Sequence, residues 1–260
     1  MSRVGGRERL STVRIRPYTR PPTPDPLQIL IALHQLPASM NGRCDFHTHT
    51  VITDGELLPI ESIRRARVLG YKAIAITEHL GAEDPAPLLE RLKQECRMGS
   101  EGFGVQAFFG VEITHVPPKF IAAVAGRARK AGAQVILVHG ETVAEPVARG
   151  TNWAAVGSDI DILAHPGLLA PREARATAAK GIFLEVTSRP GHAYTNGHVV
   201  ATGRAAGAAF LINSDSHAPK DMMGEDMAAR IGMGAGLDQK ELHRTLKDNP
   251  RQLIRRLAER

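Results

Sequence analysis

The chain has 260 residues, of which 43% are hydrophobic and 23% are charged, and its formal net charge is +6. This composition is ordinary for a globular protein and excludes disordered and collagen-like classes. No apolar run reaches the ~18 residues that a membrane span needs, and two cysteines are too few for a disulfide framework. We therefore expect a cytoplasmic protein that has no contact with a membrane.

The first forty residues differ in composition from the rest of the chain. Five prolines fall between Pro17 and Pro26, interleaved with arginine and threonine. Such a segment is typical of extended, poorly ordered chain, and a short apolar stretch from Leu27 to Leu36 could add a packed helix. We expect a basic, Pro-rich extension over residues 1–40 and a single domain over residues 41–260.

Short apolar runs alternate with stretches of helical period from residue 43 onward. The apolar runs are Cys44–Phe46, Ala73–Thr77, Ala107–Val111, Val135–Val138, Ile160–Ala164, Ile182–Val186 and Ala209–Ile212. The helical stretches are Pro59–Leu69, Pro87–Arg97, Lys119–Ala131, Arg172–Lys180, Val199–Ala206 and Gln239–Leu246. Near-continuous apolar strands between helices indicate parallel strands buried on both faces. Seven such units predict an α/β fold, a (β/α)7 TIM-like barrel in one domain.

Histidine and acidic side chains follow nearly every predicted strand. The candidates are His47, His49, Asp54, His79, Glu112, His139, His165, Asp215 and His217. In an α/β barrel the carboxyl ends of the strands meet at one rim, so we expect these groups to converge. Carboxylates packed together repel one another, and divalent cations relieve that repulsion. Since a catalytic zinc ion takes about three protein ligands, the set would serve two or three ions. Nitrogen and oxygen ligands without cysteine favour zinc, iron or manganese.

The sequence blocks that carry these residues resemble those of a known superfamily. They are His47-Thr48-His49 with Asp54-Gly55, Thr77-Glu78-His79, Glu112 with His139, and His165 followed by Ser214-Asp215-Ser216-His217. This set is similar to the polymerase and histidinol phosphatase (PHP) superfamily of metal-dependent phosphoesterases. The resemblance spans about residues 44–217 and fills all nine ligand positions. It implies a distorted seven-stranded barrel, in agreement with the strand pattern.

The resemblance also implies how the ligands are shared among three ions. The first ion would take His47, His49, Glu112 and Asp215; the second Glu112, His139 and His165; the third Asp54, His79 and His217. Glu112 would bridge two ions, and Glu112 and Asp215 would be central to catalysis. A hydroxide shared by two ions is a strong nucleophile at neutral pH, so no covalent nucleophile is required.

A polar segment after the sixth strand could contact substrate. Arg189 could clamp a phosphate, and His192 could touch the substrate or protonate the leaving oxygen. A capped surface loop leading into a helix at Asn196 is an equal alternative for this segment. His115, three positions after Glu112, could line the same mouth.

We expect hydrolysis of a small-molecule phosphomonoester similar to histidinol phosphate. A PHP-type nuclease or nucleotide phosphoesterase is the alternative. Nucleic acid is possible as a partner but not favoured. The positive charge lies in residues 1–43 and 247–260, where solvated basic tails are the simpler interpretation. Aromatic residues, on which bases stack, make up only 4% of the chain. A metal-dependent amidohydrolase is less favoured, because the predicted fourth strand lacks the lysine that such barrels commonly carry. A non-enzymatic metal-binding role is also possible.

Overall fold

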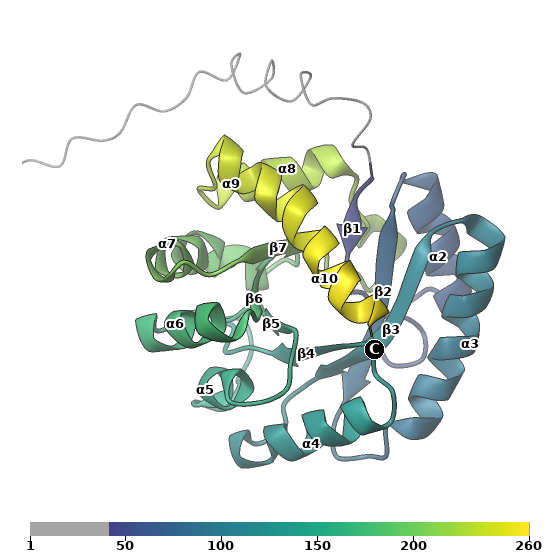
Figure 1. Ribbon diagram of the computed structural model, residues 1–260, viewed down its shortest axis with the longest axis horizontal. Coiled ribbons are helices and arrows are strands. Elements are labelled where there is room, and N and C mark those ends of the chain that lie inside the picture. Colours follow the sequence, from purple (N-terminus) through teal and green to yellow (C-terminus); the bar gives the residue numbers. More distant parts are fainter. Residues whose placement is uncertain (1–41, 260) are drawn as a thin grey trace, which may run out of the picture. The chain divides into compact units, whose positions relative to one another are not determined.

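Seven parallel strands run in chain order through the computed structural model, in which residues 42–259 are described (Figure 1). The strands are β1 (Cys44–Asp45), β2 (Ala73–Leu80), β3 (Gln106–Ile113), β4 (Val135–His139), β5 (Ile162–Ala164), β6 (Phe183–Thr187) and β7 (Phe210–Asn213). Each coincides with a predicted apolar run. The expected extension over residues 1–40, with its helix at Leu27–Leu36, lies outside the described residues.

In residues 42–259, one α-helix connects each strand to the next on the outer side of the sheet, and three more α-helices follow β7 (Figure 1). They are α2 (Pro59–Val68), α3 (Ala86–Phe103), α4 (Pro118–Lys130), α5 (Thr151–Val156), α6 (Pro171–Lys180), α7 (Asn196–Ala206), α8 (Glu225–Gly234), α9 (Gln239–His243) and α10 (Asn249–Ala258), with short 3₁₀ turns η2 (His192–Thr195) and η3 (Pro219–Asp221) and a π turn η4 (Arg244–Asp248). Among residues 42–259, no helix is both long and apolar enough to cross a membrane.

The sheet curls until its first and last strands meet. Each strand pairs in parallel with the next along the chain, from β1 to β7. Beyond the two edge strands, Thr48 and Ser216 form a parallel bridge, and the amide of His49 donates to the carbonyl of Ser216 at 2.8 Å. The prediction of a (β/α)7 TIM-like barrel in a single α/β domain is therefore confirmed.

Local sequence signals explain how the connecting helices begin and end. Proline occupies the first turn of α2, α4 and α6, where the missing amide hydrogen costs nothing. Gly181 and Gly207 end α6 and α7 with φ angles of 66° and 71°, a left-handed conformation that glycine adopts without strain. Each turns the chain directly into the next strand.

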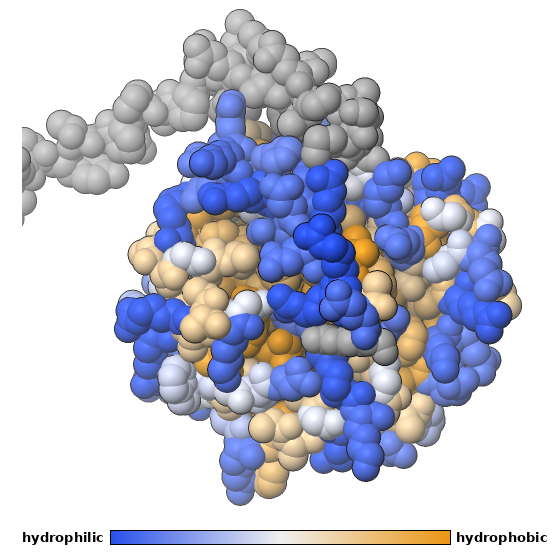
Figure 2. All heavy atoms as spheres, viewed as in Figure 1, coloured by the Kyte–Doolittle hydropathy of each residue, from blue (hydrophilic) through white to orange (hydrophobic). Residues whose placement is uncertain are grey.

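Helix α10 closes the amino end of the barrel, a feature that the sequence analysis missed. Leu253 and Leu257 are fully buried and join the core cluster that Phe46 and Phe183 form inside the barrel. Figure 1 shows α10 crossing in front of the strands, and in Figure 2 hydrophilic residues cover its outer side. The expectation of a solvated basic tail over residues 247–260 is therefore wrong, because two leucines on one face of this helix pack into the core.

Candidate metal centre

The nine predicted ligands converge at the carboxyl ends of the strands. They come from β2, β3 and β4 and from the loops after β1, β5 and β7. Their ligand atoms fall into groups in which every atom lies within 4.8 Å of the others: His49, Asp54, His79 and His217; His47, His165 and Asp215; His47, His49 and Glu112; Glu112, His139 and His165. The groups share members, so they form one continuous cluster. The assignment of these residues as ligands stays a prediction.

Glu112 lies at the centre of the cluster and is fully buried. Its Oε1 atom lies 3.3 Å from Nε2 of His47, 3.3 Å from Nδ1 of His139 and 3.4 Å from Nε2 of His165. Asp215 approaches the same imidazoles, with Oδ1 at 3.6 Å from Nε2 of His47. The carboxylate of Glu112 thus belongs to two of the donor groups, as a bridging role requires.

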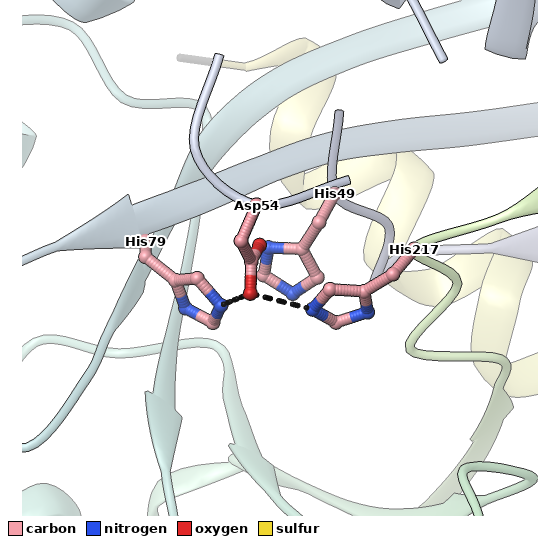
Figure 3. A group of neighbouring side chains, drawn as sticks. All are labelled: His49, Asp54, His79 and His217. Carbon is pink, nitrogen blue, oxygen red and sulfur yellow. Dashed lines mark ion pairs between the residues drawn. The ribbon is translucent and has the colours of Figure 1, made fainter. Parts of the chain in front are cut away.

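The group that corresponds to the third ion surrounds the carboxylate of Asp54 (Figure 3). Oδ2 of Asp54 lies 3.3 Å from Nε2 of His79 and 3.3 Å from Nε2 of His217. The imidazole of His49 stacks on both of these rings, with centroids 4.1 and 4.4 Å away. His49 therefore lies between the donors expected for the first ion and those expected for the third ion. The resemblance assigns it to the first ion alone.

Several atoms of the buried half of this cluster have no hydrogen-bond partner. Among residues 42–259, nine buried side-chain nitrogen or oxygen atoms have no such partner, and seven of them belong to His47, His49, Glu112, His139 and His165. An unsatisfied buried polar atom costs about 1–3 kcal/mol, so native proteins rarely retain several together. Lone pairs that face one another without a proton between them are what metal ligation needs. The residues present therefore fit divalent metal ions.

Outer partners fix the direction in which the imidazoles point. Nδ1 of His47 lies 2.8 Å from Oε1 of Glu185, and Nδ1 of His79 lies 2.7 Å from the hydroxyl of Thr114. When a partner accepts the Nδ1 proton, the Nε2 lone pair is free to bind a metal. Nε2 of His47 faces Glu112 and Nε2 of His79 faces Asp54. Nδ1 of His79 also lies 2.9 Å from Oε2 of Glu112.

Burial and neighbouring charges shift the pKa values of these groups in different directions. Burial alone would raise the pKa of Glu112, but His47 and His139 outweigh it and hold that pKa well below its usual value. Burial, together with the charges of Glu112 and Glu185, raises the pKa of Asp215 to about 7, against the opposing effect of His47. Burial and the neighbouring His79 keep the pKa of His49 well below its usual value. Glu112 is therefore ionised and His49 neutral at pH 7, the forms in which both bind metals.

The backbone is strained where the chain enters this centre. Among residues 42–259, the residues other than glycine with positive φ are His115, His165 and Asp215, at 53°, 24° and 52°. Each follows a strand end, and a residue held in this region costs about 1–3 kcal/mol. Strain of this kind is typical of functional sites, and here it falls on two candidate ligands and on one residue of the mouth.

The three predicted substrate residues lie around the mouth of the barrel but in different settings. His192 is 5% exposed, and its Nδ1 lies 2.8 Å from the hydroxyl of Thr142. Nη1 of Arg189 lies 3.4 Å from Oδ2 of Asp221, a carboxylate that also accepts the amide of His217. Nε2 of His115 lies 3.1 Å from Oε2 of Glu145. Their roles toward a substrate stay predictions.

Comparison with known sequences places the chain beside an archaeal protein. No family model matches it. The uncharacterized protein MJ1295 of Methanocaldococcus jannaschii is 46% identical over 219 residues, which are 83% of this chain and the whole of that protein. The chain belongs to the same family as MJ1295. The name of that relative states no activity.

Solved structures resemble the chain in fold. A chain of an archaeal ribonuclease P with mature tRNA is similar with a TM-score of 0.60 at 13% identity, over 82% of this chain and 90% of that one. An Xaa-Pro dipeptidase is similar with a TM-score of 0.58 at 12% identity, over 84% and 76%. A putative histidinol phosphatase from Listeria monocytogenes is similar with a TM-score of 0.52 at 13% identity, over 69% and 97%. At these identities the likeness concerns the barrel alone.

Two carboxylates of the centre were not among the predicted site residues. Glu185 lies in the middle of β6, fully buried, and contacts His47. A carboxylate inside an apolar strand was a usable signal, because such a group must have buried partners. Glu145 lies in the loop after β4 and contacts His115, His139 and His192. No sequence pattern marks it, since its position depends on how that loop folds over the mouth.

Proposed function

We propose that this chain is a metal-dependent hydrolase of the PHP type that acts on small-molecule phosphate monoesters. The observation that carries the proposal is the buried carboxylate of Glu112, which faces three imidazoles at 3.3–3.4 Å within two donor groups. The four sequence blocks that resemble the superfamily supply all members of both groups. Bound divalent ions would lower the pKa of water and neutralise the charge of phosphate oxygens.

The chain's own residues would hold and orient the substrate. His47, His139 and His165 would supply ligand nitrogens, and Glu112 and Asp215 would supply the negative charge that retains several cations. Arg189 would exchange its partly buried contact with Asp221 for a bidentate contact with phosphate. His192 is held by Thr142 and would lie beside the leaving oxygen.

Phosphoesters are favoured over amides because of what β4 carries. Amidohydrolase barrels commonly use a modified lysine there, whereas β4 reads Val-Ile-Leu-Val-His and ends at His139. The bridging position is filled instead by the carboxylate of Glu112 from β3.

The test combines metal analysis with a substrate panel. Freshly purified protein is analysed for metals and assayed on histidinol phosphate, an aryl phosphate, a single-stranded oligonucleotide and a dipeptide. We expect about two to three ions per chain and phosphomonoesterase activity that chelators remove and manganese or zinc restores. Turnover of the oligonucleotide with a steep salt dependence would favour the nuclease alternative. Fewer than two ions without phosphoester turnover, or turnover of the dipeptide alone, would overturn the proposal.

A further inference from the structure

A further group of donors lies at the barrel mouth and shares only His139 with the nine residues described above. The carboxylate of Glu145 faces three imidazoles there: Oε2 lies 3.1 Å from Nε2 of His115 and 3.1 Å from Nε2 of His139, and Oε1 lies 3.4 Å from Nε2 of His192. Three loops bring them together, those after β3, β4 and β6, with His139 at the end of β4. The ligand atoms of His115, His139 and Glu145 all lie within 4.8 Å of one another.

The contact between His139 and Glu145 has the spacing of shared ligands but is not a hydrogen bond. Nε2 of His139 is buried and has no hydrogen-bond partner, although Oε2 of Glu145 is only 3.1 Å away. Donor atoms about 2.1 Å from a tetrahedral ion lie about 3.4 Å apart. The 3.1 Å between Nε2 of His139 and Oε2 of Glu145 is close to that spacing. Nε2 of His115 lies at the same distance from this oxygen and forms a hydrogen bond with it.

His139 separates this group from the central cluster. Its Nδ1 lies 3.3 Å from Oε1 of Glu112, while its Nε2 faces Glu145. Among the ion pairs and ring contacts of residues 42–259, His139 is the one predicted ligand that His115 and Glu145 contact. An ion at the mouth would therefore depend on two residues that the central ions do not need.

The donor set of this group suits zinc and similar transition metals. It offers two imidazole nitrogens and a carboxylate, whereas magnesium and calcium prefer oxygen ligands. His192 lies beside the group: Thr142 holds its Nδ1 at 2.8 Å, and its Nε2 faces the other oxygen of Glu145.

We propose that His115, His139 and Glu145 form a separate binding site for a divalent ion of the zinc class at the mouth of the barrel. The site does not rest on the phosphoesterase proposal, because its donors are complete whatever the substrate. His115 and Glu145 are 44% and 38% exposed at their side chains. Water competes for such ligands, so this site binds its ion more weakly than the buried cluster does.

The experiment counts zinc ions as free zinc is raised. Protein stripped with chelator is dialysed against a series of zinc buffers, and bound zinc per chain is measured by elemental analysis. We expect a group of tightly bound ions at low free zinc and one additional ion at higher free zinc. The variants His115→Ala and Glu145→Ala should lose this additional ion and keep the tightly bound ones.

Two controls separate this result from other causes. Glu83→Ala removes an exposed carboxylate from the loop after β2, and His243→Ala removes an exposed imidazole; both should bind as many ions as wild type. Anomalous scattering at the zinc edge should locate the additional ion beside His115 and Glu145. Wild-type protein without an additional ion, or His115→Ala protein that keeps it, would overturn the proposal. Failure of the central cluster would instead remove the tightly bound ions.

Discussion

Oε1 of Glu185 lies 2.8 Å from Nδ1 of His47, and both side chains are fully buried. The same oxygen accepts from Nδ2 of Asn213 at 2.8 Å, and Oε2 accepts from the amide of His165 at 3.0 Å. Glu185 thereby connects two candidate ligands from different strands. Its two oxygens both act as acceptors, a requirement that only a carboxylate meets.

Glu185→Gln should weaken metal binding without removing a ligand. Glutamine has one acceptor oxygen, so in either orientation its amide group would face a donor, which costs about 1–3 kcal/mol. Loss of an outer partner of a metal-binding histidine typically lowers metal affinity about 10–100-fold. Competition with a chromophoric chelator would measure this. The matched control is Glu173→Gln, which changes a buried carboxylate that accepts a hydrogen bond from the amide of Ala170. This control should leave metal affinity unchanged. Equal metal affinities for the two variants would refute the role of Glu185.

Glu112→Gln should remove the carboxylate from two donor groups at once. We expect the number of tightly bound ions to fall and hydrolysis to decrease by more than ~100-fold, beyond the effect of an outer partner. Metal analysis and initial rates on the same preparation would check both. A variant with wild-type turnover and a full complement of ions would contradict the bridging assignment.

Leu253→Ala should destabilise the fold while leaving the metal centre intact. Leu253 is fully buried in the core cluster at the amino end of the barrel, and truncation of such a leucine costs about 2–5 kcal/mol. Urea unfolding would give the change in the free energy of unfolding. Val68→Ala, at a position 69% exposed on α2, is the control and should change it by less than about 0.5 kcal/mol. Loss of metal in the folded Leu253→Ala protein would show that the two ends of the barrel are coupled.

Glu241→Gln should reduce stability in a pH-dependent way. Glu241 receives two contacts from Arg204, at 2.7 and 2.6 Å, and this pairing lowers the pKa of Glu241 to about 2. Because the unfolded chain takes up the proton at higher pH than the folded chain, the stabilisation is complete above about pH 4.5 and is lost as the pH falls toward 2. For a pair this exposed we expect about 1 kcal/mol or less at pH 7.

Urea unfolding of wild type and Glu241→Gln at pH 7, 5, 4 and 3 would measure this difference. The two free energies of unfolding should converge as the pH falls below about 4.5. Arg204→Met should remove the same pH dependence. A difference that stays constant down to pH 3 would rule out the ion pair as its source.

The sequence alone determined the barrel and the set of candidate ligands. Strands that are apolar on both faces must be covered on both sides, so their alternation with helices leaves a parallel α/β arrangement. The carboxyl ends of parallel strands share one rim, so side chains such as His47 and Asp215 had to meet although 168 positions separate them. The seven strands were predictable for this reason, whereas α5, α8 and α10 were not: α5 is only six residues long, and half of the residues of α10 are polar or charged.

Tertiary structure decided everything that depends on distances between loops and buried partners. Glu185 became a partner of His47 only because β6 and the end of β1 face the same interior. Glu145 came to lie among three imidazoles only because the loop after β4 folds over the mouth. The place of His49 between two donor groups likewise depends on ring stacking with His79 and His217. Periodicity along the chain fixes which face of a strand a side chain occupies, but contacts across the barrel depend on the closure of the sheet, which no local pattern encodes.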